Sequence, residues 1–206
     1  MTVMRGARNA WRWIVVGSTV VLGTRTMIGA LIRGRMTLDL GIGRSIRALG
    51  PITIDVAAPR DIVFDVAAAP YGPRPPAELR RHVEVLQRSP GMVLAAHRTP
   101  VGHDEAVTVE GVVLERPSRM GFRLVRGPVP HVVEEFRFED AEGGETELTY
   151  HGELGTDLWG LGRAWGNCVA AMWEETVRRS LDQIRDAAER RARAKAPPNA
   201  GAATED

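Results

Sequence analysis

The feature that most constrains the fold is a run of six short segments between residues 82 and 154. In each segment apolar side chains recur at every second position, which is the period of a strand with one buried face. The sequences between them are turn-like, namely SPG, PVGHD, PSR, GPVP and DAEGG. Connections this short join antiparallel neighbours, because a parallel pair needs a crossover of a dozen or more residues. The chain is therefore predicted to contain an antiparallel sheet.

Two helical segments and one further strand frame this run. ITIDVAA, from Ile52, alternates as a strand, and PRDIVFDVAAA, from Pro59, predicts a short helix. Apolar residues then recur at helical spacing from about Asp157 to Ala194, and only this helix is long enough to cover the apolar face of a sheet. The predicted fold class is α+β. It is a curved antiparallel seven-stranded sheet wrapped around a long C-terminal helix, with a short helix after the first strand.

The first 50 residues differ in charge from the rest of the chain. They hold eight arginines and one acidic residue, a net charge of +7, whereas residues 51–206 carry a net charge of −6. Residues 13–32 form a mainly apolar run of 20 residues, which matches a bilayer span, although Arg25 lies past its middle. Three alternatives stay open: a membrane span, an arm on a membrane surface, and an apolar arm packed on the domain. The basic arm favours an anionic membrane surface as partner, and the acidic body argues against nucleic acid.

These changes in composition divide the chain into three parts. Residues 1–50 are predicted to be a basic, apolar arm that ends in a linker, residues 51–194 a single domain, and residues 195–206 a disordered tail. The only cysteine, Cys168, excludes an internal disulfide and is predicted to be a buried thiol. A chain without disulfides fits the cytoplasm, with the arm as the means of any membrane association.

Metal and cofactor motifs are missing from the sequence. The five histidines lack ligand spacing, and His97 and His103 flank a turn, so both are predicted to face solvent. The serines lack the Gly-x-Ser-x-Gly elbow of serine hydrolases. Neither a metal nor a cofactor is predicted.

The hairpin RLVRGPVPHVVEEFRF, from Arg123 to Phe138, carries charged residues on a face that is otherwise apolar. Arg126 and Glu134 fall on neighbouring strands on the predicted inward face, and Tyr150 lies on the next strand. Three interpretations stay open. Arg126 and Glu134 pair with each other at the end of the sheet, or the three residues orient the polar head of a ligand, or Glu134 or Tyr150 acts as acid or base in a cyclisation or dehydration.

The segments ITIDVAAPRDIVFDVAAAP and GELGTDLWGLGRAWGNCVAAMWEETVRRSLDQI, with the order of elements between them, resemble the SRPBCC superfamily. This is the START-like, helix-grip group that includes polyketide cyclase/dehydrase and lipid-transport proteins. The resemblance implies an elongated, mainly apolar cavity between the sheet and the last helix, and the superfamily shares no catalytic motif. The residues expected to line the cavity are Val109, Phe122, Leu124, Arg126, Glu134, Phe136, Tyr150, Trp165, Val169 and Met172.

The favoured function is binding or transport of a hydrophobic small molecule, such as a lipid, a polyketide or a quinone-like compound. An enzyme of the polyketide cyclase or dehydratase type is the first alternative, and an interaction module with a filled core is the second. An open cavity with paired polar groups at its base would favour the enzyme, a purely apolar cavity the carrier, and a cavity filled by Trp165 and Phe136 the interaction module.

Overall fold

The computed structural model describes residues 27, 29–31, 33–101 and 104–195. The elements follow the predicted order, which confirms the α+β helix-grip fold. They are β1 (Ser45–Val56), α2 (Arg60–Ala68), β2 (Val83–Ser89), β3 (Met92–Val101), β4 (Asp104–Glu115), β5 (Arg119–Arg126), β6 (His131–Asp140), β7 (Thr146–Thr156) and α3 (Trp159–Lys195). Short 3₁₀ turns, η1 (Ala69–Tyr71), η2 (Leu79–Arg81) and η3 (Glu142–Gly144), lie in the connections.

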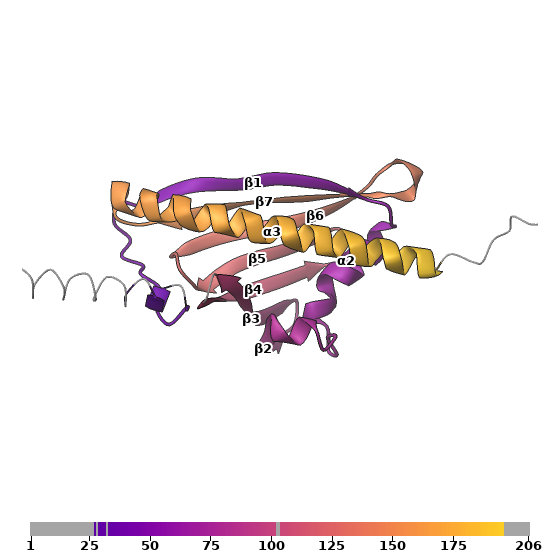
Figure 1. Ribbon diagram of the computed structural model, residues 1–206, viewed down its shortest axis with the longest axis horizontal. Helices are drawn as coiled ribbons and strands as arrows, with labels where there is room; N and C mark the ends of the chain where they lie inside the picture. Colours follow the sequence, from indigo (N-terminus) through magenta and orange to yellow (C-terminus); the bar gives the residue numbers. More distant parts are fainter. Residues whose placement is uncertain (1–26, 28, 32, 102–103, 196–206) are drawn as a thin grey trace, which may run out of the picture.

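The seven strands form one antiparallel sheet in the order β1-β7-β6-β5-β4-β3-β2. The long helix α3 crosses one face of this sheet, and α2 lies beneath its C-terminal half (Figure 1). The contacts of α3 are mainly with β1, β7 and α2. The same face of β3, β4 and β5 is therefore less completely covered by the helix.

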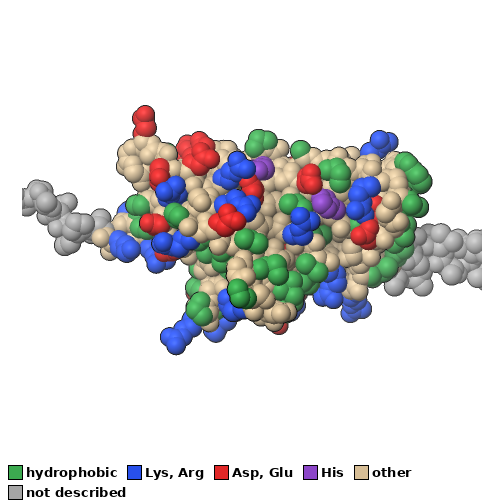
Figure 2. Space-filling view, turned by 180° about the vertical axis from the view of Figure 1, so that it is seen from behind, with side chains coloured by type: hydrophobic (Ala, Val, Ile, Leu, Met, Phe, Trp, Pro, Cys, Tyr) green, Lys and Arg blue, Asp and Glu red, His purple; other side chains and the backbone are tan. Residues whose placement is uncertain are grey.

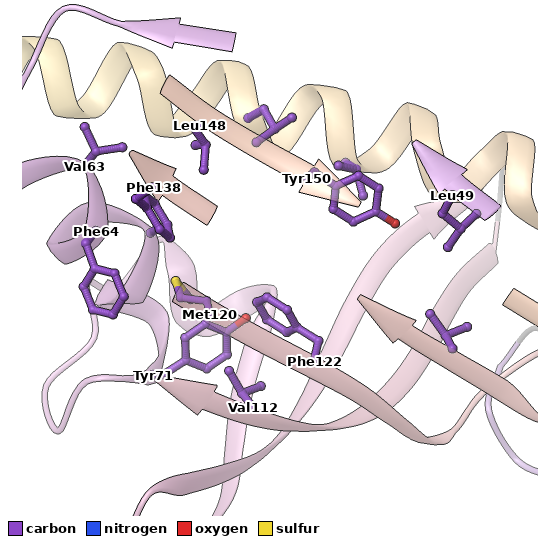
Figure 3. Packing of buried hydrophobic residues seen from close by; sticks show 14 of the residues in the cluster. Leu49, Val63, Phe64, Tyr71, Val112, Met120, Phe122, Phe138, Leu148 and Tyr150 are labelled. Atoms are coloured by element: carbon purple, nitrogen blue, oxygen red, sulfur yellow. The ribbon is translucent and has the colours of Figure 1, made fainter. Parts of the chain in front are cut away.

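The hydrophobic core lies between α3, α2 and the sheet. Its largest fully buried side chains include Tyr150, Phe138, Leu49, Met120 and Leu148, and Figure 3 shows these residues between the strands and the helices. Burying a side chain of this size contributes about 1.5–3 kcal/mol. The core therefore holds α3 against the sheet along most of its length.

The first strand begins earlier than the sequence indicated. We predicted that the domain starts at residue 51, whereas β1 begins at Ser45 and pairs with β7 from its first residue. The pairing shifts register between Leu49 and Ile52, and Gly50 takes a φ of +74° at this irregularity. The Gly50-Pro51 step resembled a boundary, but it is a bulge inside a continuous strand.

Residues 33–44 are fixed to the domain at two points. The side chain of Asp157, just before α3, accepts hydrogen bonds from the backbone N–H groups of Leu40 (2.7 Å) and Gly41 (2.8 Å) and from Nε of Arg44 (2.8 Å). The hydrogen bond from Arg44 is the main cause that lowers the pKa of Asp157 to about 2. At the other point, Thr37 Oγ1 lies 2.9 Å from both the N–H and the carbonyl of Gly127, in the β5–β6 turn. This part of the chain therefore spans one end of the grip.

Most of the apolar run at residues 13–32 and the tail at 196–206 lie outside the described residues. Residues 27 and 29–31 are helical. Among the residues that the structure describes, no helix is long and apolar enough to cross a membrane.

Candidate functional site

The site centres on a carboxyl group inside the grip, that of Glu134 on β6. Tyr150 Oη, on β7, and Trp173 Nε1, on α3, both donate hydrogen bonds of 2.7 Å to its Oε2. The cross-strand neighbours of Glu134 are Phe122 on β5 and Gly152 on β7. A Cβ atom at Gly152 would lie 2.6 Å from the Cβ of Glu134, so the glycine makes the room that this side chain occupies.

Its surroundings give Glu134 an unusual acidity. Burial is the main cause that raises the pKa of Glu134 from its ordinary value of 4.5 to about 7, and the negative charge of Glu110 adds to it. The hydrogen bonds from Tyr150 and Trp173 act in the opposite direction, because they stabilise the carboxylate. Glu134 therefore exchanges its proton near neutral pH, as a general acid or base requires.

A second carboxyl group lies on the same face, on β4. Glu110 is 4% exposed, and its Oε2 lies 2.8 Å from Nδ1 of His97 while its Oε1 accepts a 2.7 Å hydrogen bond from Thr108. Burial alone would raise the pKa of Glu110, but the charge and hydrogen bond of His97 lower it below its ordinary value. Conversely, burial would lower the pKa of His97, and Glu110 raises it. Both pKa shifts therefore favour a charged pair of His97 and Glu110, and Tyr71 Oη lies 3.1 Å from the other ring nitrogen of His97.

Four aromatic rings form a row between the two carboxyl groups. The ring centroids are 6.2 Å apart for Tyr71 and Phe122, 5.5 Å for Phe122 and Phe136, and 5.6 Å for Phe136 and Tyr150, each pair in an edge-to-face arrangement. Figure 3 shows Tyr71 and Phe122 packed together on the strands, with Tyr150 above them on the side of α3. The site thus combines an apolar aromatic surface with a titratable group on each side.

Several side chains of this interior are only partly buried. Leu124, Glu134, Phe136, Trp165 and Trp173 keep intermediate exposure, although they face the core or pack against it. This exposure follows from the position of α3, which covers β1 and β7 more fully than β4 and β5. Part of the aromatic row and Glu134 therefore remain in contact with solvent.

The outer face of the sheet carries a hollow of about 420 Å³, and its lining includes Phe122, Glu134 and Gly152 as well as residues that face outward. It lies where Gly111 and Gly121 supply no side chains, and its charged walls pair with one another, as Arg119 does with Glu135. Figure 2 shows this face, on which basic, acidic and histidine side chains alternate. The buried carboxyl groups of Glu110 and Glu134 and the aromatic row between them face the helices, so we place the candidate site inside the grip.

The structure brings together most of the residues expected to line a cavity. Phe122, Glu134, Phe136 and Tyr150 meet as described above, and Leu124 packs beside them. On α3, Trp165 and Val169 face the sheet, where Val169 belongs to the core and Trp165 Nε1 donates a 2.9 Å hydrogen bond to the carbonyl of Pro128. Trp165 thus fastens the helix to the β5–β6 turn rather than to Phe136.

Two of the expected lining residues lie elsewhere in the sheet. Arg126 is exposed and pairs across the sheet with Val109, whereas the partner of Glu134 on β5 is Phe122, so Arg126 and Glu134 do not form the ion pair that we considered. Val109 is buried but lies on the outer face, because Glu110 and Val112 point inward and side chains alternate along a strand.

Three side-chain environments also differ from the prediction. Met172 is 38% exposed and lies on the outer side of α3. Cys168 is exposed and is not a core thiol, because the helix turns it away from the sheet. His97 is largely turned inward against Glu110, with 17% of its side chain exposed, because the β3–β4 register places it on the inner face.

The prediction missed Glu110, His97 and Tyr71 as members of the site. A signal for the first two exists in the sequence, because antiparallel pairing of β3 with β4 places His97 opposite Thr108 and leaves Glu110 two residues away on the same face. Tyr71 carries no comparable signal, since it stands at the start of a segment broken by prolines, where no strand or helix period applies. In the described part of the chain, no group of three or more histidine, cysteine or acidic side chains is arranged to hold a metal ion.

Comparison with known proteins places the chain in a group with this fold. Residues 52–189 match the family described as polyketide cyclase/dehydrase and lipid transport, which confirms the resemblance to the SRPBCC superfamily. The Zhui aromatase/cyclase from Streptomyces sp. R1128 superposes with a TM-score of 0.63 at 21% identity, over 75% of this chain and 100% of that one. Norcoclaurine synthase from Thalictrum flavum, in complex with dopamine and hydroxybenzaldehyde, gives 0.53 at 10% identity, over 76% and 91%. At these identities the structures establish the shared fold. No curated protein matches the chain.

Proposed function

Because the chain belongs to the polyketide cyclase/dehydrase and lipid-transport family, we propose that it binds a hydrophobic small molecule between the sheet and α3. The ligand would be an oxygen-bearing compound of the lipid, polyketide or quinone class. The observation that carries this proposal is the carboxyl of Glu134, which is partly accessible, has a pKa of about 7 and lies beside an aromatic row. Binding sites for small molecules commonly combine an apolar lining with a few convergent polar groups.

The geometry of Glu134 indicates how it would contact a ligand. Both of its hydrogen-bond donors, Tyr150 and Trp173, end on Oε2, so Oε1 is the oxygen available to a ligand. In the acid form the group donates to a carbonyl, and in the carboxylate form it accepts from a hydroxyl. A ligand with one of these groups, and with an apolar body that lies on Phe122 and Phe136, would match the site.

Native mass spectrometry of the purified full-length chain tests this proposal. We expect a discrete bound mass, or saturable binding when 2-naphthol is added as a probe. We also expect weaker binding by a Glu134→Gln variant at pH 8, where the wild-type carboxyl is mainly ionised and accepts from the naphthol hydroxyl, whereas the amide nitrogen of the variant cannot accept. A bare protein mass together with no binding of 2-naphthol would contradict the proposal. Equal binding by wild type and variant would remove Glu134 from the site.

The acidity of Glu134 also favours a second candidate, an enzyme that transfers protons. In such a reaction the Glu134 carboxylate takes a proton from the carbon next to a ketone, which gives an enolate and the carboxylic acid, and the acid then returns the proton. Cyclisation and dehydration of a polyketide both begin with this kind of step. Hydrogen–deuterium exchange at the α-carbon of 2-tetralone, followed by NMR, tests it: exchange should be catalysed by wild type and lost in Glu134→Gln. If wild type and Glu134→Gln both show exchange only at the uncatalysed rate, proton transfer is excluded and the binding function remains.

For residues 1–50 we propose association with an anionic membrane surface. Their net charge of +7, next to the apolar run at 13–32, supports this partner. Full-length protein should sediment with vesicles of phosphatidylcholine and phosphatidylglycerol more than with phosphatidylcholine alone. Replacing Arg5, Arg8 and Arg12 by serine should reduce the difference. Equal sedimentation with both vesicles would oppose the electrostatic part of the proposal.

A further inference from the structure

Exposed hydrophobic side chains gather at the end of the domain where α3 begins. Leu40 and Ile42, from the segment before β1, are 48% and 50% exposed, and Trp159 and Leu161, in the first turn of α3, are 63% and 75% exposed. Two hydrogen bonds of 2.9 Å, from Leu158 N–H to the carbonyl of Ile42 and from Trp159 N–H to that of Gly43, hold the two segments together. Figure 2 shows hydrophobic side chains along this end of the molecule, at its right-hand edge. We call Leu40, Ile42, Trp159 and Leu161 the apolar end patch.

The backbone at the patch is held in an uncommon conformation. Leu158 and Trp159 have φ values of 69° and 47°, which non-glycine residues adopt only rarely and at a cost of about 1–3 kcal/mol. Gly43 permits the arrangement, because a Cβ there would lie 2.3 Å from the Trp159 ring. The structure therefore carries strain to hold a large aromatic side chain at the surface instead of in the core. Such an outlier is a sign of function at the position where it occurs.

The charges beside the patch indicate its partner. Arg163, two residues after Leu161, and Arg35, five residues before Leu40, are exposed, and the acidic groups Asp39 and Asp157 both pair with Arg44. A second copy of this chain would bring the same positive charges and repel the first. An anionic lipid surface complements the arginines and also accepts apolar side chains.

The sequence before the patch leads to the same partner. The apolar run at 13–32, then Arg33 and Arg35, precede Leu40 in the sequence. Tryptophan, leucine and arginine are the residue types that settle at the boundary between acyl chains and headgroups.

We propose that the apolar end patch docks on an anionic bilayer, with Trp159 and Leu161 at the level of the headgroups. This inference rests on the proposed membrane association of residues 1–50 and specifies which part of the folded domain meets the lipid. It places the first turn of α3, and with it one end of the grip, against the membrane.

Site-specific labelling of the full-length chain tests the docking directly, because Cys168 is the only cysteine. In a Cys168→Ser background, Leu161→Cys places a label in the patch, and Leu86→Cys places a matched label on β2, where Leu86 is 49% exposed. Each variant is labelled with the fluorophore NBD and mixed with vesicles of phosphatidylcholine and phosphatidylglycerol. At position 161 we expect the emission to rise at least about twofold, to shift to the blue and to be quenched by spin-labelled lipid, as transfer of a surface position into the interface requires. At position 86 we expect no change.

A protein that sediments with vesicles but gives the same emission at positions 161 and 86 would overturn the patch while leaving association through residues 1–50 intact. A protein that does not sediment would overturn both proposals. As a second readout, Leu161→Ser should weaken vesicle binding roughly tenfold through the loss of one apolar side chain, whereas Leu86→Ser should not. Because both side chains are exposed, we expect neither substitution to affect folding. Unchanged circular dichroism and thermal unfolding will verify this.

Discussion

Replacing Glu134 by glutamine should change how the stability of the protein depends on pH. The amide keeps an oxygen that can accept from Tyr150 Oη and Trp173 Nε1, as the carboxyl does at 2.7 Å in each case. What the variant loses is the ability to ionise inside the grip. The comparison of wild type with Glu134→Gln therefore isolates the titration of one buried group.

The size of the effect follows from the displaced pKa. Folding raises the pKa of Glu134 from 4.5 to about 7, so the folded protein holds this proton more tightly than the unfolded chain does. The resulting stabilisation is fully present below about pH 4.5, declines as the pH rises, and is lost by about pH 7. A displacement of this size corresponds to about 3 kcal/mol at 1.36 kcal/mol per pKa unit.

Urea unfolding of both proteins between pH 4.5 and 8.5 measures the effect. The free energy of unfolding of wild type, minus that of Glu134→Gln, should fall by about 3 kcal/mol across this range. Glu135→Gln serves as the control, because ion pairs with Arg137 and Arg119 outweigh burial and lower the pKa of Glu135, so its contribution has the opposite sign. Parallel profiles for wild type and Glu134→Gln would refute the displaced acidity, and with it the case for proton transfer.

Three further perturbations test the packing around the site and the attachment of residues 33–44. Gly152→Ala should destabilise the protein by about 1–3 kcal/mol in thermal unfolding, because its new Cβ would lie 2.6 Å from Glu134. Gly121→Ala is the control and should cost little, because the nearest atom to its new Cβ is the end of a flexible arginine at 3.5 Å. Asp157→Asn should expose residues 33–44 to limited proteolysis at neutral pH. In wild type the pKa of Asp157 is lowered to about 2, so the attachment should persist until the pH falls from about 4 towards 2. A variant that resists proteolysis would show that the Arg44 contact is dispensable. Leu181→Ala, at a fully buried position of α3, should cost about 2–5 kcal/mol by urea unfolding, and a loss under 1 kcal/mol would mean that α3 is not packed as described.

Local patterns were sufficient for the elements of the fold. The alternation in RMGFRLVR and the turns on either side of it predicted β5 over the residues that the structure shows, and helical periodicity located α3 to within a few residues. The start of β1 could not be found in this way. A Gly-Pro step normally separates elements, and here only the pairing with β7 carries the strand through it.

The site was less predictable, because it depends on which face of each strand turns inward. Along β4 both faces are rich in valine, so hydrophobicity does not show which face is buried. The carboxyl of Glu110 made its own face look like the solvent side, and the prediction turned Val109 inward instead. Glu110 is accommodated inside by His97 on the neighbouring strand, a partner that can be found only by pairing β3 with β4 and not from the sequence of β4 alone. For β6 and β7 the alternation showed which face is buried, and the prediction placed Glu134, Phe136 and Tyr150 on the face that the structure turns inward.

A crystal structure of the full-length chain with its co-purifying compound, or with 2-naphthol, tests the central claim most directly. We predict that the ligand lies between the sheet and α3, with its apolar body on Phe122 and Phe136. Its oxygen should lie within about 3 Å of the Glu134 carboxyl. A ligand in the outer hollow beside Gly111 and Gly121, or one inside the grip that makes no contact with Glu134, would contradict the account.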